Sequence, residues 1–260
     1  MADGRLRLCV ISDIHGNVEA LRAVLRRIRT LGADMLLVAG DLAAQGPRPA
    51  EALDELRGLS NVVIVRGNTD RYLAETRPLP PPYWPASEIT ARLRSLEWTR
   101  EQLGEERLRF LAALPAEAVV DGCLVVHASP GNDERGIFPA TQLERFDSPA
   151  WTAVMTCGHT HLPVHRRFGD RHVVNAGSVG WPLDGDPRSS FAVIEQGGHP
   201  SGWRVVLERV DYDQSAVVGD LEARRVPWRA QVCRFIETAT AGTSHGQDGA
   251  RGAAGPVTVG

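Results

Sequence analysis

The sequence is poor in cysteine, and none of its four cysteines belongs to a Cys-x-x-Cys pair. Cys9, Cys123, Cys157 and Cys233 are scattered along the 260 residues, and three of them lie in runs typical of strands. This scatter argues against a disulfide framework. We expect four buried free thiols, as in proteins of the reducing cytosol.

Long apolar runs are also missing. No run approaches the roughly 18 residues that a membrane-spanning helix needs, and Asp3, Arg5 and Arg7 interrupt the apolar core that a signal peptide requires. The formal net charge is only −3, so the sequence carries no strong electrostatic footprint for nucleic acid or an anionic membrane. We therefore expect a cytoplasmic protein without membrane contacts. Its oligomeric state stays open, and a homo-oligomer is one alternative.

Hydrophobic residues make up 43% of the chain, which is enough to bury a large core. In the first quarter of the chain, short apolar runs alternate with segments of helical periodicity, and Asn17 and Gly32 are suited to cap the first helix. This alternation predicts a parallel sheet with right-handed crossovers. The predicted strands are 6–11, 35–39 and 62–65, and the predicted helices are 18–31 and 49–59.

Prolines between 78 and 85 interrupt this alternation and predict an extended surface link. Two helices are expected next, at 87–103 and 105–114, with Gly104 between them. The remainder is mostly β, with hairpin turns at Asp121-Gly122 and Gly169-Asp170. The predicted strands there are 118–120, 124–126, 154–157, 164–168, 172–174, 191–195 and 203–210.

The last predicted helix covers 214–224, and its continuation past Pro227 toward Glu237 is left open. From 239 onward the sequence is built of Gly, Ala, Thr and Ser with almost no large apolar residue. We therefore expect one domain over 1–238 and a disordered tail over 239–260.

The stretch Gly158-His159-Thr160-His161 carries the clearest chemical signal. It follows the predicted strand 154–157, and neutral imidazole is the commonest side-chain metal ligand near neutral pH. Two imidazoles this close, at the mouth of a strand, can face one point. We read the pair as candidate metal ligands.

Four other predicted strands also end in residues of metal-ligand type. Because the carboxyl ends of strands in an open α/β sheet converge on one crevice, we expect these side chains to gather. Two carboxylates and four imidazoles crowded together need a cation, and two ions that share one carboxylate would use all seven groups. The candidate ligands are Asp13, His15, Asp41, Asn68, His127, His159 and His161.

Six sequence blocks occur in a characteristic order: D-x-H-G-N, G-D-x-x-x-x-G-P, G-N-x-D, H-A-S-P, G-H-T-H and N-x-G-S-V-G. Together they resemble the calcineurin-like metallophosphoesterase superfamily, and in particular its small bacterial and archaeal phosphodiesterase-type branch. The resemblance extends from Leu6 to Val210. It implies an α/β fold, a four-layer α/β/β/α sandwich of two mixed sheets with a two-metal site at the strand ends.

The resemblance also implies roles for individual residues. Asp41 would bridge two divalent ions, with Asp13, His15 and His161 on the first, and Asn68, His127 and His159 on the second. The residues do not choose among Mn, Fe, Co, Ni and Zn, and we expect manganese. A hydroxide bridging the metals would attack phosphorus in line. The implied catalytic residues are Asp41, Asn68, His127 and Asp70, and the implied substrate contacts are Asn17, Asn68 and Arg135.

Two positions depart from the wider family pattern. Thr69 stands where many members have a histidine, and threonine is no general acid near neutral pH. We therefore expect leaving groups that need little protonation, such as aryl alcohols. Gln45 breaks the arginine-containing pattern of the protein phosphatases, which argues against that activity. Asn175, Gly177 and Ser178 are expected to form a structural turn beside the site.

The function implied is hydrolysis of small phosphate esters that depends on a dinuclear metal site, with phosphodiesters such as cyclic or small nucleotides favoured. Three alternatives stay open. They are a phosphomonoesterase or protein phosphatase, a nuclease acting on polymeric DNA or RNA, and a non-catalytic metal-binding scaffold of the same fold.

Overall fold

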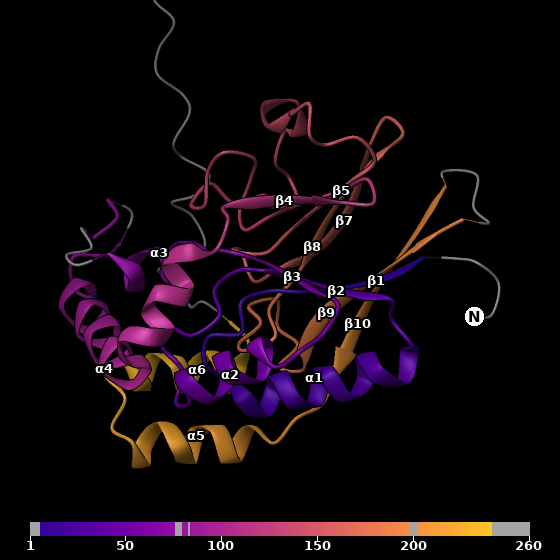
Figure 1. Cartoon of the computed structure of the whole chain (residues 1–260). Helices are drawn as coiled ribbons and strands as arrows, with labels where there is room; N and C mark the ends of the chain where they lie inside the picture. Colours follow the sequence, from indigo (N-terminus) through magenta and orange to yellow (C-terminus); the bar gives the residue numbers. More distant parts are fainter. Residues whose placement is uncertain (1–5, 76–79, 83, 198–201, 241–260) are drawn as a thin grey trace, which may run out of the picture.

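The computed structural model describes residues 6–75, 80–82, 84–197 and 202–240. Two five-stranded sheets lie face to face, and helices cover one side of the pair (Figure 1). Both sheets contain parallel and antiparallel neighbours, which confirms the predicted α/β class with two mixed sheets. No helix among the described residues has the length and apolar character needed to cross a bilayer.

The first sheet, sheet A, has the strand order β10-β9-β1-β2-β3. Its three N-terminal strands are parallel, as predicted, while β9 and β10 are antiparallel to their neighbours. The parallel strands therefore end at one edge. The bounds are β1 (Arg7–Ile11), β2 (Met35–Ala39), β3 (Val62–Val65), β9 (Ser189–Gln196) and β10 (Trp203–Val210).

The second sheet, sheet B, has the order β4-β5-β6-β8-β7. Strands β5, β6 and β8 are parallel, and tight turns at Asp121-Gly122 and Gly169-Asp170 join the antiparallel pairs, as predicted. The bounds are β4 (Glu117–Val120), β5 (Cys123–Val126), β6 (Val154–Cys157), β7 (Pro163–Phe168) and β8 (Arg171–Ala176).

The core between the sheets is apolar because alternate side chains of both sheets face inward. Val10 and Leu37 from sheet A pack with Val125 and Val174 from sheet B, and all four are fully buried. Burying such side chains is the main favourable term in folding. This packing fixes the two sheets relative to each other and so fixes their strand ends.

Helices α1 (Val18–Leu31) and α2 (Pro49–Arg57) pack on the outer face of sheet A (Figure 1). Helix α1 has the predicted ends. The Asn17 side chain accepts a hydrogen bond from the Ala20 N–H, and Gly32 closes the helix with φ 65°. The apolar face predicted for this helix, including Leu21 and Val24, is buried.

Helix α4 (Ile89–Ala113) is broken at Gly104, where φ 68° and ψ 173° are not helical, so the two predicted helices are observed with a kink between them. Helix α3 (Asn68–Ala74) was not predicted, because the polar start of this segment suggested only a loop after β3. Of the predicted proline link, residues 78, 79 and 83 lie outside the described residues, and Trp84 is buried.

The outer face of sheet B is covered by the connection 127–153. Among the described residues, this layer contains a 3-10 helix, Leu143–Phe146, and the fully buried Trp151, rather than an α-helix. The fourth layer of the sandwich is therefore mostly irregular.

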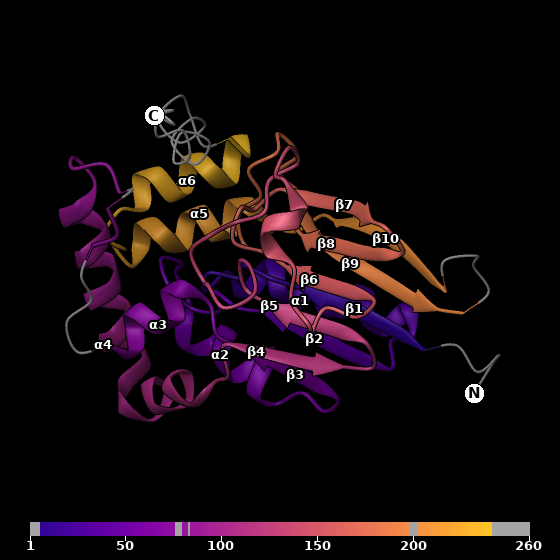
Figure 2. The same ribbon diagram turned by 90° about the horizontal axis from the view of Figure 1, so that it is seen from above.

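The chain ends in two helices, α5 (Gln214–Ala223) and α6 (Arg229–Thr238). The sequence left open whether the helix at 214–224 continues past Pro227. It does not, because Arg225 and Trp228 adopt positive φ and interrupt the helix. Both helices lie with α4 at one end of the sheets (Figure 2). Of the predicted tail, 241–260 lie outside the described residues, while the buried Ala239 accepts a hydrogen bond from Gly185.

Candidate metal centre

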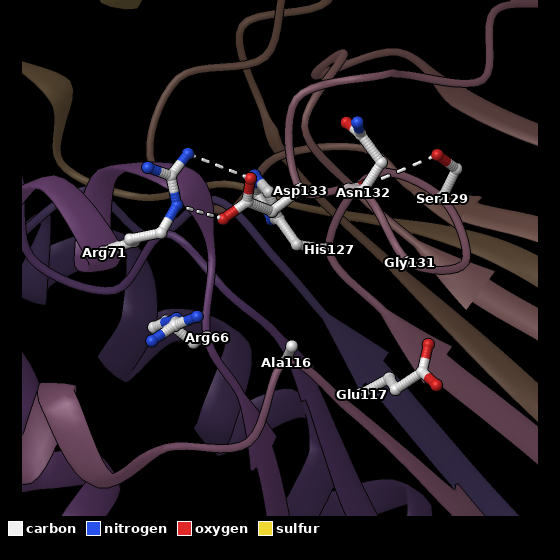
Figure 3. A pocket seen from close by; sticks show the side chains of 9 residues that line it. All are labelled: Arg66, Arg71, Ala116, Glu117, His127, Ser129, Gly131, Asn132 and Asp133. Atoms are coloured by element: carbon white, nitrogen blue, oxygen red, sulfur yellow. Dashed lines mark hydrogen bonds and ion pairs between the residues drawn. The ribbon is translucent and has the colours of Figure 1, made fainter. Parts of the chain in front are cut away.

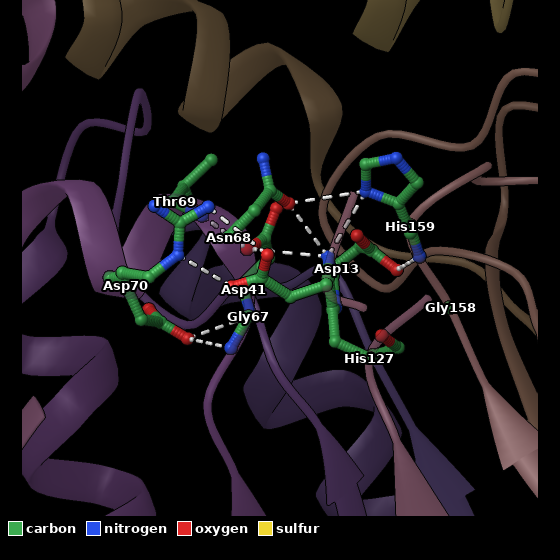
Figure 4. A network of polar contacts seen from close by, with 12 residues as sticks. Asp13, Asp41, Gly67, Asn68, Thr69, Asp70, His127, Gly158 and His159 are labelled. Atoms are coloured by element: carbon green, nitrogen blue, oxygen red, sulfur yellow. Dashed lines mark hydrogen bonds and ion pairs between the residues drawn. The ribbon is translucent and has the colours of Figure 1, made fainter. Parts of the chain in front are cut away.

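Polar residues that follow β1, β2, β3, β5 and β6 meet at one place. Figure 4 shows Asp41, Asn68 and His127 of this cluster close together, with His159 and Asp13 beside them. Sheet A supplies four of the side chains after β1, β2 and β3, and sheet B supplies three after β5 and β6. All seven predicted ligands are brought together, and six of the seven are less than 9% exposed. They are Asp13, His15, Asp41, Asn68, His127, His159 and His161.

Three of these side chains form a first group, which we call the aromatic half because Trp181 covers it. The Nε2 atoms of His15 and His161 lie 3.3 Å apart, and His161 Nε2 lies 3.2 Å from Asp13 Oδ1. Their ligand atoms lie close enough together to hold one ion. The Trp181 ring centroid is 4.4 Å from that of His15 and 4.3 Å from that of His161.

Three other side chains form the cavity half, named for the cavity beside His127. Asn68 Oδ1 lies 2.9 Å from His127 Nε2 and 3.1 Å from His159 Nδ1. The two imidazole nitrogens are 3.2 Å apart. One amide oxygen and two imidazoles therefore point at a common centre.

Asp41 lies between the two halves. Its Oδ2 is 3.6 Å from His15 Nε2 in the aromatic half, and its Oδ1 is 3.5 Å from His127 Nε2 in the cavity half. The Thr69 backbone N–H donates a hydrogen bond to Oδ1 at 2.9 Å. One carboxylate therefore contacts both groups, which is the arrangement that a bridging ligand needs.

Backbone carbonyls fix the tautomer of three of the imidazoles. The Nδ1 atoms of His15, His127 and His161 lie 3.0, 2.7 and 2.9 Å from carbonyl oxygens of Ala44, Ala39 and Trp181, respectively. A carbonyl only accepts, so each Nδ1 carries the hydrogen and each Nε2 turns a lone pair into the cluster.

This donor set fits divalent cations. Burial lowers the pKa of His15 and of His159 to about 3, so both rings are neutral and able to bind a metal. The Nε2 atoms of His15 and His161, 3.3 Å apart, need either a shared proton or a cation between them. Asp13 Oδ1 is buried without a hydrogen-bond partner among the described residues. Mixed nitrogen and oxygen ligands suit first-row transition metals.

The backbone at the cluster is strained. Asp13, His15, Asp41, His159 and His161 all have positive φ, between 50° and 66°. Non-glycine residues avoid this region, and such strain gathers at functional sites. Five such residues in one cluster indicate that the fold holds these side chains in place at the expense of local backbone energy.

Two glycines are required by the crowding around the carboxylates. A Cβ on Gly67 would lie 2.1 Å from Asp41 Oδ1, and a Cβ on Gly158 would lie 2.3 Å from Asp13 Oδ2. Neither position has room for a side chain. The G-N-x-D and G-H-T-H blocks therefore begin with glycine for a steric reason.

Asp70, a predicted catalytic residue, lies behind Asp41. Its fully buried carboxylate accepts three backbone N–H groups, those of Asp41 and Gly67 at Oδ2 and that of Leu42 at Oδ1, each at 2.9 Å. These bonds join the loop after β2 to the loop after β3. Asp70 therefore holds the backbone at Asp41 and, through Gly67, the backbone next to Asn68.

The predicted substrate contacts other than Asn68 lie outside the cluster. Asn17 Oδ1 caps α1, and Asn17 Nδ2 donates to the Gly180 carbonyl at 2.8 Å, so both polar atoms are engaged. Arg135 is exposed, and its guanidinium lies 5.3 Å from the centroid of the Phe146 ring. Roles for both residues in binding substrate stay predictions.

The predicted turn beside the site is confirmed. Asn175 Nδ2 donates to the Gly158 carbonyl at 2.7 Å, and Asn175 Oδ1 accepts the Gly177 N–H at 2.9 Å. Ser178 Oγ donates to the Asp13 carbonyl at 2.8 Å. This turn therefore supports the backbone of two loops, the one that carries His159 and the one that carries Asp13.

Three residues near the site were missed by sequence reasoning. Trp181 packs on two of the imidazoles, and Arg66 and Arg71 line the cavity next to His127. Their positions carried a signal, because Arg66 and Arg71 flank the G-N-x-D block and Trp181 directly follows N-x-G-S-V-G. Arginine and tryptophan have no metal-ligand character, so this signal was overlooked.

The fold and the donor set together define a metal-binding α/β protein whose site lies at the strand ends. Residues 6–197 match the model of the calcineurin-like phosphoesterase superfamily domain, and the chain belongs to this family. It is a metallophosphoesterase and hence a hydrolase. The resemblance noted in the sequence is therefore confirmed.

Two related sequences cover most of the chain. Phosphodiesterase YfcE of Escherichia coli is 30% identical over 197 residues, which are 71% of this chain and 85% of that protein. An uncharacterized protein of Methanocaldococcus jannaschii is 29% identical over 241 residues, which are 85% of this chain and 93% of that protein.

Solved structures agree with the fold. The metallophosphoesterase from Sphaerobacter thermophilus superposes with a TM-score of 0.75 at 28% identity, covering 91% of this chain and all of that one (100%). A hypothetical protein from Pyrococcus horikoshii gives a TM-score of 0.77 at 22% identity, covering 90% and 98% of the two chains. The second likeness concerns the fold alone.

Proposed function

We propose that this chain hydrolyses small phosphodiesters, such as cyclic or small nucleotides, with two divalent metal ions held by its seven clustered side chains. The observation that carries the proposal is the position of Asp41, whose two carboxylate oxygens face separate groups of ligands at 3.6 and 3.5 Å. The Escherichia coli relative is named a phosphodiesterase, which supports the choice of diesters over other phosphate esters.

The metal ions would be divided between the two halves of the cluster. Asp13, His15 and His161 would hold one, Asn68, His127 and His159 would hold the other, and Asp41 would be shared. When bound, two such cations activate a water molecule as nucleophile and neutralise charge on the phosphate oxygens. Manganese stays our preferred metal; the donor set itself, nitrogen and oxygen without a thiolate, suits first-row divalent ions in general.

Several protein groups would act around the substrate. Asp70 keeps Asp41 aligned through the backbone and serves as a positioning residue. The Thr69 hydroxyl is buried without a hydrogen-bond partner among the described residues, so it is available to donate to a phosphate oxygen. Because threonine does not protonate a leaving group at neutral pH, aryl esters should react faster than alkyl esters.

The direct substrate contacts are assigned to Asn68, Asn17 and Arg135. Asn68 has an amide at the cavity half of the cluster, where it can hold both metal and phosphate. Arg135 would reach the substrate from the rim of the site, since its neighbour Gly136 packs against the His159 ring, where an added Cβ would lie 3.0 Å from Cδ2. Asn17 would have to give up its capping bonds to bind substrate.

A cytoplasmic location is part of the proposal. All four cysteines are buried and free. Unpaired thiols are typical of proteins from reducing compartments. The oligomeric state is not part of the proposal, and a homo-oligomer stays an alternative.

The test uses three substrates with protein loaded with Mn²⁺, Co²⁺ or Ni²⁺. They are a bis-aryl phosphate, an aryl monophosphate and a 2′,3′-cyclic nucleotide. We expect the two diesters to be hydrolysed with a higher kcat/KM than the monoester. A preference for the monoester would support a phosphomonoesterase, and no turnover of any substrate by metal-loaded protein would support a non-catalytic scaffold.

A further inference from the structure

A cavity of about 420 Å³ lies next to the cavity half of the metal centre, and the two share His127 as a wall (Figure 3). Its volume is in the range of sites that take small organic ligands. Its walls come from the loop after β3, the start of β4 and the loop after β5. They are formed by Arg66, Arg71, Ala116, Glu117, His127, Ser129, Gly131, Asn132 and Asp133.

The two arginines in the cavity differ in their partners. Arg71 is saturated, because its guanidinium bonds both carboxylate oxygens of Asp133 at 2.8 and 3.0 Å and also reaches Glu134 at 2.7 Å. Figure 3 shows the paired contact with Asp133 as two dashed lines. The same contact neutralises Asp133, so the cavity is not dominated by that negative charge.

Arg66 has no comparable partner. Its backbone N–H donates to the Pro115 carbonyl at 2.8 Å, which anchors the main chain. Within the described part of the chain, its guanidinium forms no ion pair, and its Nε is buried without a hydrogen-bond partner. A buried donor left unpaired is unfavourable, and an unpaired guanidinium suits a phosphate group.

The position of Arg66 connects this unpaired charge to the metal centre. Arg66 comes two residues before Asn68, and the cavity that it lines is bounded by His127, which belongs to the same half of the cluster. Ser129 and Asn132 add polar groups to the walls. A ligand that extends from the cluster past His127 would meet the Arg66 guanidinium.

We propose that the Arg66 cavity binds a second phosphate of the substrate. This phosphate is carried by whichever of the two ester substituents lies beside His127. The inference rests on the proposed function, since it assumes that the scissile phosphate binds at the metal cluster. The substrate class is then a diester that carries a further phosphate monoester, such as a 5′-phosphorylated dinucleotide, rather than a diester whose only phosphate is the scissile one.

Binding of product-like ligands tests the cavity without turnover. Calorimetry on metal-loaded protein would compare thymidine 3′,5′-bisphosphate with thymidine 5′-monophosphate. We expect the bisphosphate to bind about tenfold more tightly, in line with one charge-assisted hydrogen bond. The Arg66→Met variant should lose this difference and Arg66→Lys should keep part of it. Arg26→Met, a change on the exposed face of α1, should keep all of it.

Turnover supplies the second readout. We expect the native protein to hydrolyse the 5′-phosphorylated dinucleotide pTpT with about a tenfold higher kcat/KM than TpT. In Arg66→Met, the two substrates should have the same kcat/KM. Equal affinity for both phosphates in the native protein, or an unchanged preference in Arg66→Met, would overturn the inference while diester hydrolysis persists. If no diester is hydrolysed, the proposed function fails, and the calorimetric comparison still decides whether the cavity binds a second phosphate.

Discussion

The two halves of the metal centre have opposite surroundings. Trp181 packs on both imidazoles of the aromatic half and stacks in turn on Phe235 of α6, with ring centroids 4.8 Å apart. Among the described residues, no comparable aromatic ring is recorded over the cavity half, which adjoins a cavity lined mainly by polar side chains. Packing against the C-terminal helices therefore covers one half, while the other half, with the partly exposed His159, faces a cavity.

This difference assigns separate roles to the two halves: one keeps the candidate ligands in place, and the other is open to a small molecule. In the aromatic half, Trp181 belongs to an apolar cluster that includes Leu221 and Ile236 and that packs on the candidate ligands His15 and His161. In the cavity half, Arg66 and Asn132 offer polar groups to a ligand that approaches from outside. For the proposed function we therefore expect substrate to enter over His127, with the aromatic half as the fixed side of the site.

Loss of the group shared by both halves should have the largest effect. Asp41→Asn keeps the shape of the side chain but removes the charge between the two ligand groups. We expect kcat to fall about a thousandfold, which corresponds to about 4 kcal/mol of transition-state stabilisation. Elemental analysis should show fewer bound metal ions per chain.

A matched control for Asp41→Asn is Asp147→Asn, which removes an exposed carboxylate paired with Arg171 at 2.7 Å. That variant should keep native activity and metal content. If Asp41→Asn binds two ions and retains native turnover, Asp41 does not join the two halves.

Truncation in the aromatic half should mainly affect stability. Trp181→Ala leaves a void against His15, His161 and Phe235, and we expect it to lower the free energy of unfolding by about 3 kcal/mol. Denaturant unfolding measures this loss. Trp181→Phe should lose less, because a ring remains in contact.

Ser129→Ala is the matched change in the cavity half. Ser129 donates only one long bond, 3.4 Å to the Asn132 carbonyl, so we expect a change of less than about 1 kcal/mol. If Trp181→Ala is no more destabilising than Ser129→Ala, the contrast between a packed half and an open half is wrong.

Asp70→Asn should have a smaller effect that reaches both halves through Asp41. Asparagine has one accepting oxygen and an NH₂ donor in place of the other, so at least one of the three N–H bonds from Asp41, Leu42 and Gly67 is lost. We expect metal affinity to fall about 10- to 100-fold, as for other residues that orient a ligand. Titration with Mn²⁺ measures the affinity.

If Asp70 has a purely structural role, Asp70→Asn should lower the stability of the protein without changing the metal affinity of the molecules that remain folded. Recovery of kcat at saturating Mn²⁺ would support its action through the position of Asp41. An unchanged Mn²⁺ affinity would contradict it.

The ligand set was predictable because each ligand directly follows a short apolar strand. The strands 35–39, 62–65 and 154–157 have the predicted bounds, and parallel strands bring distant residues such as Asp13 and His161 to one edge. Local patterns were therefore enough to predict which side chains meet.

The surroundings of the centre were not predictable in the same way. Trp181 matters because α6 carries Phe235 against it, and Arg66 matters because Arg71 takes the nearby carboxylates. Both depend on contacts between segments far apart in the chain. Helix α3 was missed because its first residues, Asn68 and Thr69, are poor helix formers whose conformation is set by tertiary hydrogen bonds.

Arg135→Gln should have the smallest effect of these changes. The Arg135 guanidinium is exposed and lies over Phe146, so solvent screens its attraction for a phosphate at the rim. We expect KM for a phosphodiester to rise by about threefold with kcat unchanged, which is less than 1 kcal/mol. Steady-state kinetics at low ionic strength would measure it, and added salt should shrink the difference. A fall in kcat instead would move Arg135 from the rim into contact with the reacting phosphate and would weaken the conclusion that His127 marks the entrance.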